Sequence, residues 1–539
     1  MSVFFNYSNP VCILGQAPSS ISHDPSIVSL KELLIYELKQ IAYYILKLED
    51  LSIDTKEVRD KVIYFISLVV ANLDFRRNEF NQIIEGLRFK KNEIEKTYID
   101  YCNEHGTPSQ LLKPSYKLDP EKSNIVNAIH EGERQALLKN TILSKIKKNL
   151  YEIIVNIIET SCLFITELDN YSVDEVDAKL DVMQLLNITN FPSLPDEKWI
   201  EMVLNFNSTT YRIMKKLKDV MVDEYGPVEE NLASTSTKPG HCILASGHFF
   251  RDLRLLLEAT ENENINIYTH DDMLMVHSLK QLNHHKHLAG HYQKTQNNTK
   301  LNFASFPGPI LISKNSLPNI ELIRGRIYTT DDYPSYGMSK IENYDFSQLI
   351  QAAKDAEGFH NETTHDPISV GYNKELILKK LHNIFDRMKS GELKHLYIID
   401  ILKQYPYTND YLEELFSIMP KDHFAISLSY PAYQENVLHI NSFYGYSLIY
   451  LILEELRANF DLPNTEVTAV FTQCNAHTLT HILNFKHIGI KNLFLGNCCP
   501  LTINPSIIRG LEELFEIKYM GNNPAEDFEM ILNRDNHQE

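Results

Sequence analysis

The stretch "HCILASGHFFRDLRLLLEAT", residues 241–260, carries the pattern that decides the fold. An apolar strand at 242–246 runs into a tight turn at Ser246-Gly247-His248, and the leucines that follow, at 253, 255, 256 and 257, predict a helix. In α/β folds, ligands gather beyond the carboxyl ends of strands that are connected in this way. His248 stands at such an end and is therefore the first candidate for holding a ligand or a metal.

The alternation of strand and helix continues downstream of this stretch. Further apolar strands are predicted at 265–270, 308–313, 325–330, 395–400, 424–429, 466–471 and 491–496. Such alternation predicts parallel sheets that are covered by helices. Two polar stretches, 224–241 and 358–371, are interpreted as linkers.

The first 220 residues have a helical pattern instead. The segment "SLKELLIYELKQIAYYILKL", residues 29–48, begins with a capping box formed by Ser29 and Glu32. Further helical patterns cover 56–72, 78–97, 121–169, 174–187 and 196–222. The predicted fold is multidomain, α plus α/β: an all-helical bundle domain over 1–230, a first Rossmann-like parallel-sheet domain over 238–360 and a second over 368–539.

Composition limits the partners and the compartment. Apolar residues make up 43% and charged residues 23% of the chain, which is typical of a soluble globular protein. The net charge is −19 and no Lys/Arg stripe stands out, which argues against nucleic acid as a partner. The amino terminus lacks a secretory pattern, and the longest apolar run, 62–71, is about half of a membrane span. We expect a cytoplasmic protein without a membrane span, for which a protein partner is possible and its identity open.

The cysteines do not form a recognisable motif. There are seven, and no two are spaced as Cys-x-x-Cys: Cys12, Cys102, Cys162, Cys242, Cys474, Cys498 and Cys499. This scatter argues against a disulfide framework and against a local zinc or iron–sulfur motif. Glycine-rich nucleotide loops and the Gly-x-Ser-x-Gly elbow are absent as well.

Segments along nearly the whole chain resemble one known family. They are "LKELLIYELKQIA" (30–42), "VVANLDFRRNEF" (69–80), "PGHCILASGHFFRDLRLLLEAT" (239–260), "INIYTHDDML" (265–274), "HLAGHY" (287–292), "FPGPILIS" (306–313), "RIYTTDDYPSYG" (326–337), "MKSGELKHLYII" (388–399) and "HIGIKNLFLGNCCPLTINPSI" (487–507). In this order they resemble the hybrid cluster proteins, also called prismane proteins or hydroxylamine reductases. The resemblance implies a helical domain with two Rossmann-like domains, a cubane iron–sulfur cluster, a hybrid iron–sulfur–oxygen cluster, and reduction of hydroxylamine or nitric oxide.

The ligand positions that the resemblance implies are mostly altered in this sequence. The cubane would need four cysteines near the amino terminus, where Cys12 stands alone. In the hybrid cluster the family's histidine matches His248, one glutamate matches Asp272, and the second glutamate and a lysine match Gln473 and Asn475. The four cysteine positions fall on Ser316, Leu402, Tyr430 and Ser442.

These exchanges predict a vestigial site, because iron–sulfur clusters need thiolate donors. We therefore expect no cofactor, no metal ligand and no catalytic residue. The expected function is that of a catalytically degenerate homologue, a pseudoenzyme that acts as a scaffold, binding or regulatory protein. The alternatives are an iron–sulfur reductase of hydroxylamine or nitric oxide, and a small-molecule sensor that uses the cavity between the domains.

Three smaller features allow other interpretations. His248, His270 and Asp272 could form a two-histidine, one-carboxylate metal site, although inherited packing explains His270 equally. The tract "NHHKHLAGHYQK", residues 283–294, could bind metal, but a structural role is expected for its third histidine and a solvated surface position for the other three (His287; His284, His285 and His291). Cys474 could be a reactive thiol, and a small buried filler is the favoured interpretation.

Overall fold

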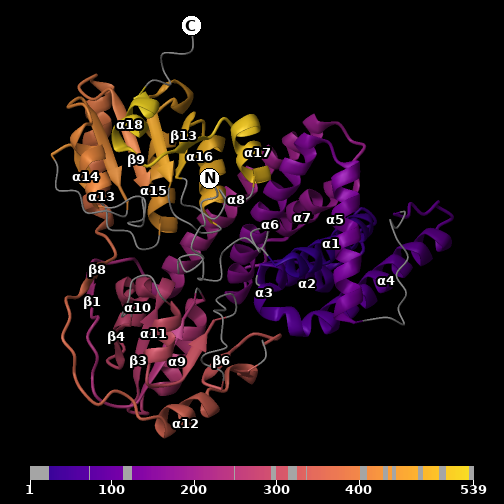
Figure 1. The fold of residues 1–539 in the computed structure, drawn as a ribbon, viewed down its shortest axis with the longest axis horizontal. Helices are drawn as coiled ribbons and strands as arrows, with labels where there is room; N and C mark the ends of the chain where they lie inside the picture. Colours follow the sequence, from indigo (N-terminus) through magenta and orange to yellow (C-terminus); the bar gives the residue numbers. More distant parts are fainter. Residues whose placement is uncertain are drawn as a thin grey trace.

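The structure is a computed structural model. It describes residues 24–71, 73–112, 124–247, 249–292, 299–313, 325–334, 337–400, 409–428, 435–439, 445–471, 477–496 and 505–532. The chain folds into a helical part followed by two parallel sheets with their helices, so the predicted fold class is confirmed. Figure 1 shows the helical part beside the two sheet units. The exact domain limits remain a prediction.

The amino-terminal part is built from helices joined by short connections. They are α1 (Pro25–Glu49), α2 (Lys56–Tyr64), the π-helix η3 (Phe65–Val70), α3 (Leu73–Arg76), the 3₁₀ helix η4 (Arg77–Glu79), α4 (Phe80–Glu104), α5 (Ile125–Ile142), α6 (Lys145–Asn170), α7 (Val176–Asn187), the 3₁₀ helix η6 (Ile188–Asn190) and α8 (Asp196–Tyr225). The single helix predicted over 121–169 is two helices, α5 and α6. The break falls at Leu143 and Ser144, because the Ser144 hydroxyl accepts the Lys147 N–H at 3.2 Å and caps α6.

The first sheet has six parallel strands in the order β4-β3-β2-β5-β6-β7. The strands are β2 (Cys242–Ser246), β3 (Asn266–His270), β4 (Leu288–His291), β5 (Ile310–Ile312), β6 (Ile327–Thr329) and β7 (Met338–Lys340). The associated helices are α9 (Phe250–Thr260), the 3₁₀ helix η7 (Asp271–Ser278), α10 (Lys280–Asn283), α11 (Thr299–Ser305), the 3₁₀ helix η8 (Glu342–Tyr344) and α12 (Ser347–Asp355). If the six strands are numbered 1 to 6 along the chain, their order in the sheet is 3-2-1-4-5-6, which is the strand order of the Rossmann fold.

The second sheet repeats this order, as β11-β10-β9-β12-β13-β14. Its strands are β9 (His395–Asp400), β10 (His423–Ser427), β11 (Val437–His439), β12 (Val467–Phe471), β13 (Asn492–Gly496) and β14 (Lys518–Met520). The associated helices are α13 (Lys374–Lys389), α14 (Asn409–Ser417), α15 (Gly445–Asn459), the 3₁₀ helix η9 (Leu462–Asn464), α16 (His477–His487), α17 (Pro505–Phe515) and α18 (Pro524–Leu532). All described strand pairs in both sheets are parallel.

The two polar stretches interpreted as linkers pair with each other. Strand β1 (Asn231–Ala233) runs antiparallel to β8 (Ile368–Val370), and isolated bridges join Thr237 to Thr363 and Gly240 to Phe359. The left side of Figure 1 shows this ribbon running alongside the first sheet. The chain thus enters and leaves the first sheet through a paired connection, which sequence composition did not predict.

The helical part shares its apolar core with the second sheet. One continuous buried cluster contains residues of α1, α6 and α8 together with residues of β9, β12 and β13. Gly510 of α17 lies so close to α6 that an added Cβ would be 2.6 Å from Ile153 Cδ1. The core of the first sheet forms separate clusters, one of which includes Tyr225 of α8.

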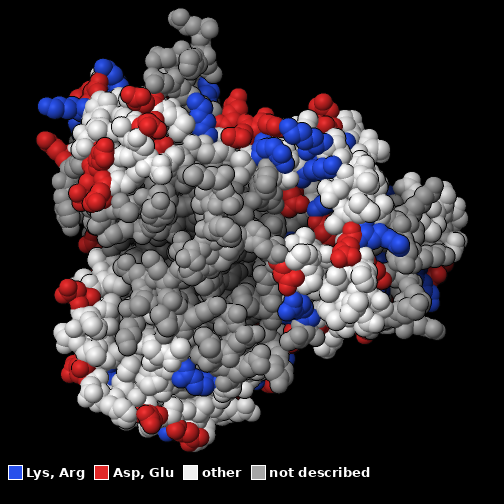
Figure 2. Space-filling model, in the orientation of Figure 1, with Lys and Arg blue, Asp and Glu red and all other residues white. Residues whose placement is uncertain are grey.

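One helix among the described residues passes the length and composition test for a membrane span. Helix α6 is long and apolar enough to cross a bilayer, but 89% of its most apolar window is buried inside the protein. On the face drawn in Figure 2, acidic and basic side chains are interspersed among the described residues.

A buried ion pair joins the helical part to the first sheet. Arg76, at the end of α3, donates to the carboxylate of Asp331, which follows β6, and both side chains have no exposed surface. Arg76 also donates to the carbonyl of Tyr333, and the Tyr64 hydroxyl donates to Asp331 Oδ1 at 3.0 Å. The environment of Asp331 raises the pKa of Tyr64, mainly through burial and secondly through the carboxylate charge.

We predict that breaking this pair on one side destabilises the protein strongly. Arg76→Met or Asp331→Leu leaves an uncompensated buried charge and should lower the free energy of unfolding by about 3–5 kcal/mol. The double variant should recover most of the loss. Urea unfolding of the full chain measures it, with Arg77→Met as the exposed control that changes little. Additive losses in the double variant would contradict the prediction.

Candidate functional site

In both sheets the strand order reverses between the first and fourth strands, β2 and β5 or β9 and β12. Ligands of such sheets bind beyond the carboxyl ends of the strands at this reversal. In the first sheet the two ends are joined: Ser313 donates its N–H to Ser246 O at 2.9 Å, and Ser313 Oγ accepts the Phe249 N–H at 3.4 Å. Gly247 follows β2 directly with a φ of 125°, which L side chains rarely adopt. At the strand-order reversal of the first sheet, hydrogen bonds therefore hold the segments that follow β2 and β5 against each other.

The predicted vestigial positions all follow strand ends in the sequence. Each stands within four residues of the end of β2, β3, β5, β9, β10, β11 or β12. The positions outside the described residues are His248, Ser316, Leu402, Tyr430, Ser442, Gln473 and Asn475. Asp272 lies in η7, but its side chain is not among those described. Their roles therefore remain predictions.

Next to the reversal, His270 at the end of β3 is held by two polar side chains. Its Nδ1 lies 3.1 Å from Ser246 Oγ, and its Nε2 lies 3.3 Å from the amide nitrogen of Asn302 in α11. The amide donates to Nε2, so Nδ1 carries the proton and donates to the serine hydroxyl. Because protein groups contact both nitrogens of this buried ring, the alternative in which His270 binds a metal is not supported.

A second polar group surrounds Thr269, the preceding residue of β3. The Thr269 hydroxyl lies 2.9 Å from His277 Nε2 and 3.0 Å from His291 Nδ1. All three side chains are buried. The interpretation of His291 as a solvated surface residue is therefore wrong: it ends β4, an edge strand that was not predicted.

The other histidines of this tract lie where they were expected. His284 is exposed and His285 is partly exposed. His287 Nε2 lies 3.1 Å from both Thr260 Oγ1 and Leu257 O, which gives it the predicted structural role.

Burial keeps the strand-end histidines neutral. It lowers the pKa of His270 to about 3 and that of His277 to about 4. At physiological pH both rings are uncharged hydrogen-bonding groups. They differ in this respect from a histidine that exchanges protons near neutral pH.

The described residues contain no metal-binding group. No cluster of three or more His, Cys, Asp or Glu side chains that could hold a metal occurs among them. The described cysteines, Cys102, Cys162 and Cys242, are buried and free, on three different elements. Burial raises the pKa of the Cys242 thiol to about 12, which keeps it protonated. These residues do not fit an iron–sulfur cluster, and Cys12, Cys474, Cys498 and Cys499 lie outside the described residues.

Comparison with known proteins gives a consistent family. The Prismane/CO dehydrogenase family matches residues 22–429. The chain is similar to the hydroxylamine reductase of Acidiphilium cryptum (strain JF-5), with 24% identity over 524 residues and 92% of each chain covered. It is also similar to that of Acidithiobacillus ferrooxidans (strain ATCC 53993 / BNL-5-31), with 24% identity over 532 residues, 93% of this chain and 92% of the relative.

A solved acetyl-CoA synthase/carbon monoxide dehydrogenase, whose title names clusters in its α subunits, matches more weakly. Its TM-score is 0.47 at 11% identity, with 94% of this chain and 82% of that chain covered. This likeness carries no argument about the chain.

The family match corrects one prediction. Membership of a Prismane/CO dehydrogenase family points to iron–sulfur cofactors, so the expectation that the protein has no cofactor is wrong. That expectation came from counting altered ligand positions, and apart from Asp272 these positions lie outside the described residues.

The buried histidines make stability depend on pH. Their pKa values in the folded protein are below the ordinary 6.5, so the unfolded chain binds more protons in acid and stability is lost as the pH falls below about 6.5. Each such ring contributes a slope of about 1.4 kcal/mol per pH unit between roughly pH 6 and pH 4.

His270→Gln can keep both hydrogen bonds but cannot bind a proton in this pH range. It should therefore reduce the pH dependence of the free energy of unfolding by the contribution of one histidine. Urea unfolding at several values between pH 4 and pH 7 measures the change, and the exposed His360→Gln serves as the control. An unchanged slope in H270Q would show that this ring does not stay neutral in the folded protein.

Proposed function

The chain belongs to the Prismane/CO dehydrogenase family, and on this premise we propose that it is a catalytically degenerate member that acts as a binding or regulatory protein. Relatives named hydroxylamine reductase align along almost the entire length of the chain, in agreement with its family membership. The proposal concerns the chemistry at the strand ends of this chain.

The proposal is carried by the exchanged ligand positions of the sequence, and the neutral polar edge next to the reversal of the first sheet adds to it. Reduction of an N–O bond consumes protons, and groups that titrate near the working pH deliver protons best. His270 instead has a pKa of about 3 and is held between Ser246 and Asn302. A ring in this state positions its neighbours and does not supply protons.

The sequence supports the same proposal on the second sheet. Where the resembling family has a glutamate and a lysine, this chain has the uncharged amides Gln473 and Asn475. Gln473 keeps the shape of the glutamate, whereas Asn475 is shorter than the lysine, and together the exchanges remove two ionisable groups. Both positions lie outside the described residues, so this support rests on the sequence alone.

The iron–sulfur cofactors to which the family points would supply electrons when bound. Among the described side chains no donor set for them is found, so we derive no step through them. The described residues contribute an edge of the first sheet whose polar side chains hydrogen-bond to one another. This edge can position a ligand next to the point where the strand order reverses.

A second candidate function follows from the comparisons. Relatives covered over 92% of their length carry the name hydroxylamine reductase, which favours an iron–sulfur oxidoreductase of that type. The prediction of a cytoplasmic location is compatible with either candidate and remains part of the proposal.

We predict that the full chain does not reduce hydroxylamine. Protein purified without air and incubated with iron and sulfide should show no hydroxylamine-dependent oxidation of reduced methyl viologen. The Acidiphilium cryptum relative, treated in parallel, is the positive control.

Iron and acid-labile sulfide are measured in the same samples, so that an inactive loaded protein is distinguished from an unloaded one. Turnover by the wild-type chain that is lost in His248→Ala would overturn the proposal in favour of the reductase.

A further inference from the structure

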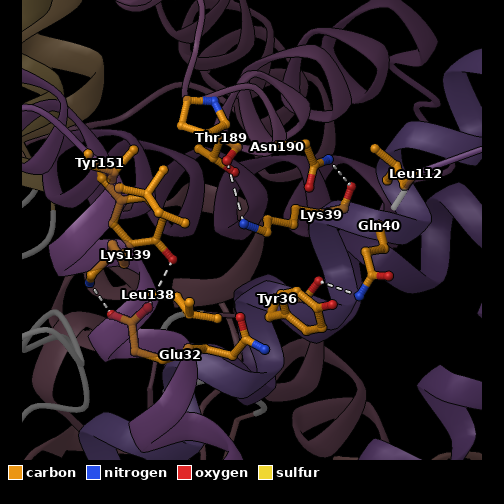
Figure 3. A pocket seen from close by; sticks show the side chains of 14 residues that line it. Glu32, Tyr36, Lys39, Gln40, Leu112, Leu138, Lys139, Tyr151, Thr189 and Asn190 are labelled. Atoms are coloured by element: carbon orange, nitrogen blue, oxygen red, sulfur yellow. Dashed lines mark hydrogen bonds and ion pairs between the residues drawn. The ribbon is translucent and has the colours of Figure 1, made fainter. Parts of the chain in front are cut away.

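A pocket in the helical part lies apart from the strand ends. It has a volume of about 160 Å³ and is lined by α1, α5, α6, η6 and the segments next to them, without any strand. Figure 3 shows the side chains around it. All of its lining residues belong to the described chain.

One wall of this pocket carries Lys39, whose ammonium nitrogen lies 5.6 Å from the centre of the Tyr36 ring. Lys39 Nζ lies 3.5 Å from the carbonyl oxygen of Thr189, at the outer limit of a hydrogen bond. An ammonium group has three N–H donors, and no described carboxylate lies within ion-pair distance of this one. Asn190 donates to the carbonyl of Lys39 at 2.8 Å and so fixes the turn against α1. The geometry leaves donors of Lys39 available to the pocket.

The remaining charges at the pocket are already paired. Glu32 accepts from Lys139 and, at 3.2 Å, from the Tyr151 hydroxyl. Lys139 also contacts Glu152 at 3.0 Å. Burial lowers the pKa of Lys39 to about 8; the Glu32 charge offsets part of this effect, and the Lys139 charge lowers the pKa by a smaller amount. An anion next to Lys39 would therefore find an ammonium group that no described carboxylate contacts directly.

Part of the pocket lining is apolar. Leu138 and Ile142 of α5, with Leu143 and Leu112, contribute aliphatic surface, and the side chain of Ile142 is 55% exposed. The pocket thus combines one available ammonium group with an aliphatic wall that reaches solvent. A multiply charged anion would find one ammonium group without a contacting carboxylate and would make no favourable contact with the aliphatic side chains.

We propose that this pocket binds a short aliphatic monocarboxylate, with its carboxylate on Lys39 and its chain against Leu138 and Ile142. The volume sets the size, since a cavity of about 150 Å³ accommodates benzene, a ligand of six heavy atoms. Butyrate has the same number of heavy atoms. A charge-assisted hydrogen bond to the ammonium group would supply the specificity for an acid over its neutral analogues.

The experiment is a titration of the full chain with butyrate at pH 7, followed by isothermal calorimetry and saturation-transfer NMR. Saturable binding is expected in the wild-type protein. Lys39→Met should weaken it at least about tenfold, because it removes the charged donor. Lys47→Met is the matched control on the same helix, where Lys47 contacts Gln110 outside the pocket, and it should bind as the wild type does.

Two further arms separate charge from shape. Butyramide, which has the same size but no charge, should bind at least about tenfold more weakly than butyrate. Leu138→Phe keeps Lys39 and fills part of the pocket, so it should weaken butyrate binding as well. Affinity should also fall as the pH rises past about 8, where Lys39 loses its proton while the Glu32–Lys139–Glu152 group stays paired.

The proposal is overturned if wild-type protein shows no saturable binding, or if K39M binds butyrate as tightly as the wild type does. Equal binding of butyrate and butyramide would overturn it too, since it would show an apolar pocket that does not recognise charge. Circular dichroism and thermal unfolding of K39M establish that the variant is folded. None of these outcomes depends on the chemistry at the strand ends.

Discussion

The buried ion pair between Arg76 and Asp331 is the constraint that fixes the helical part against the first sheet. The two residues are 255 positions apart in the sequence, and neither side chain is exposed. Removing charges from water costs several kcal/mol per ion, so this contact depends on the further groups that hydrogen-bond to the pair. Arg76 reaches both the carboxylate and the Tyr333 carbonyl, and Tyr64 occupies a further lone pair of Asp331. The strand ends of the first sheet therefore have a defined position relative to the helices.

The two sheets are attached to the helical part in different ways. The second sheet shares a continuous apolar core with the helices, and polar contacts from α8 add to it: Thr210 Oγ1 donates to Asn484 at 2.8 Å, and Lys218 contacts Glu454 at 3.1 Å. The core of the first sheet is a separate cluster that Tyr225 of α8 enters, and Arg251 donates to the carbonyl of Asn170 at 2.5 Å. The ion pair and the β1–β8 ribbon add to this contact. The first sheet thus meets the helices through a smaller apolar contact and several directional polar ones, whereas the second sheet shares the main core.

The fold could be predicted from the sequence wherever the signal was local. Runs such as Ile243–Ala245 are buried on both faces and stand out as central parallel strands. The edge strands β4, β7, β11 and β14, with three or four residues each, did not stand out, because a short half-covered strand has no distinctive pattern. This is why His291 was interpreted as a surface residue. The partners of His270 and Arg76 could not be predicted for another reason. Asn302 and Asp331 are distant in the sequence and contact these residues only in the folded chain.

The candidate site was predictable in its place but not in its chemistry. The rule that ligands gather beyond parallel strands located the reversal, and the resemblance supplied the residues. What the structure adds is that the described polar groups there satisfy one another. Ser246, His270 and Asn302 form one hydrogen-bonded chain, and Thr269 joins His277 to His291. Buried polar groups that are already paired do not need a ligand to offset their desolvation. The edge of the first sheet can therefore remain folded while the loops beyond it change, so stability places little restraint on which chemistry those loops retain.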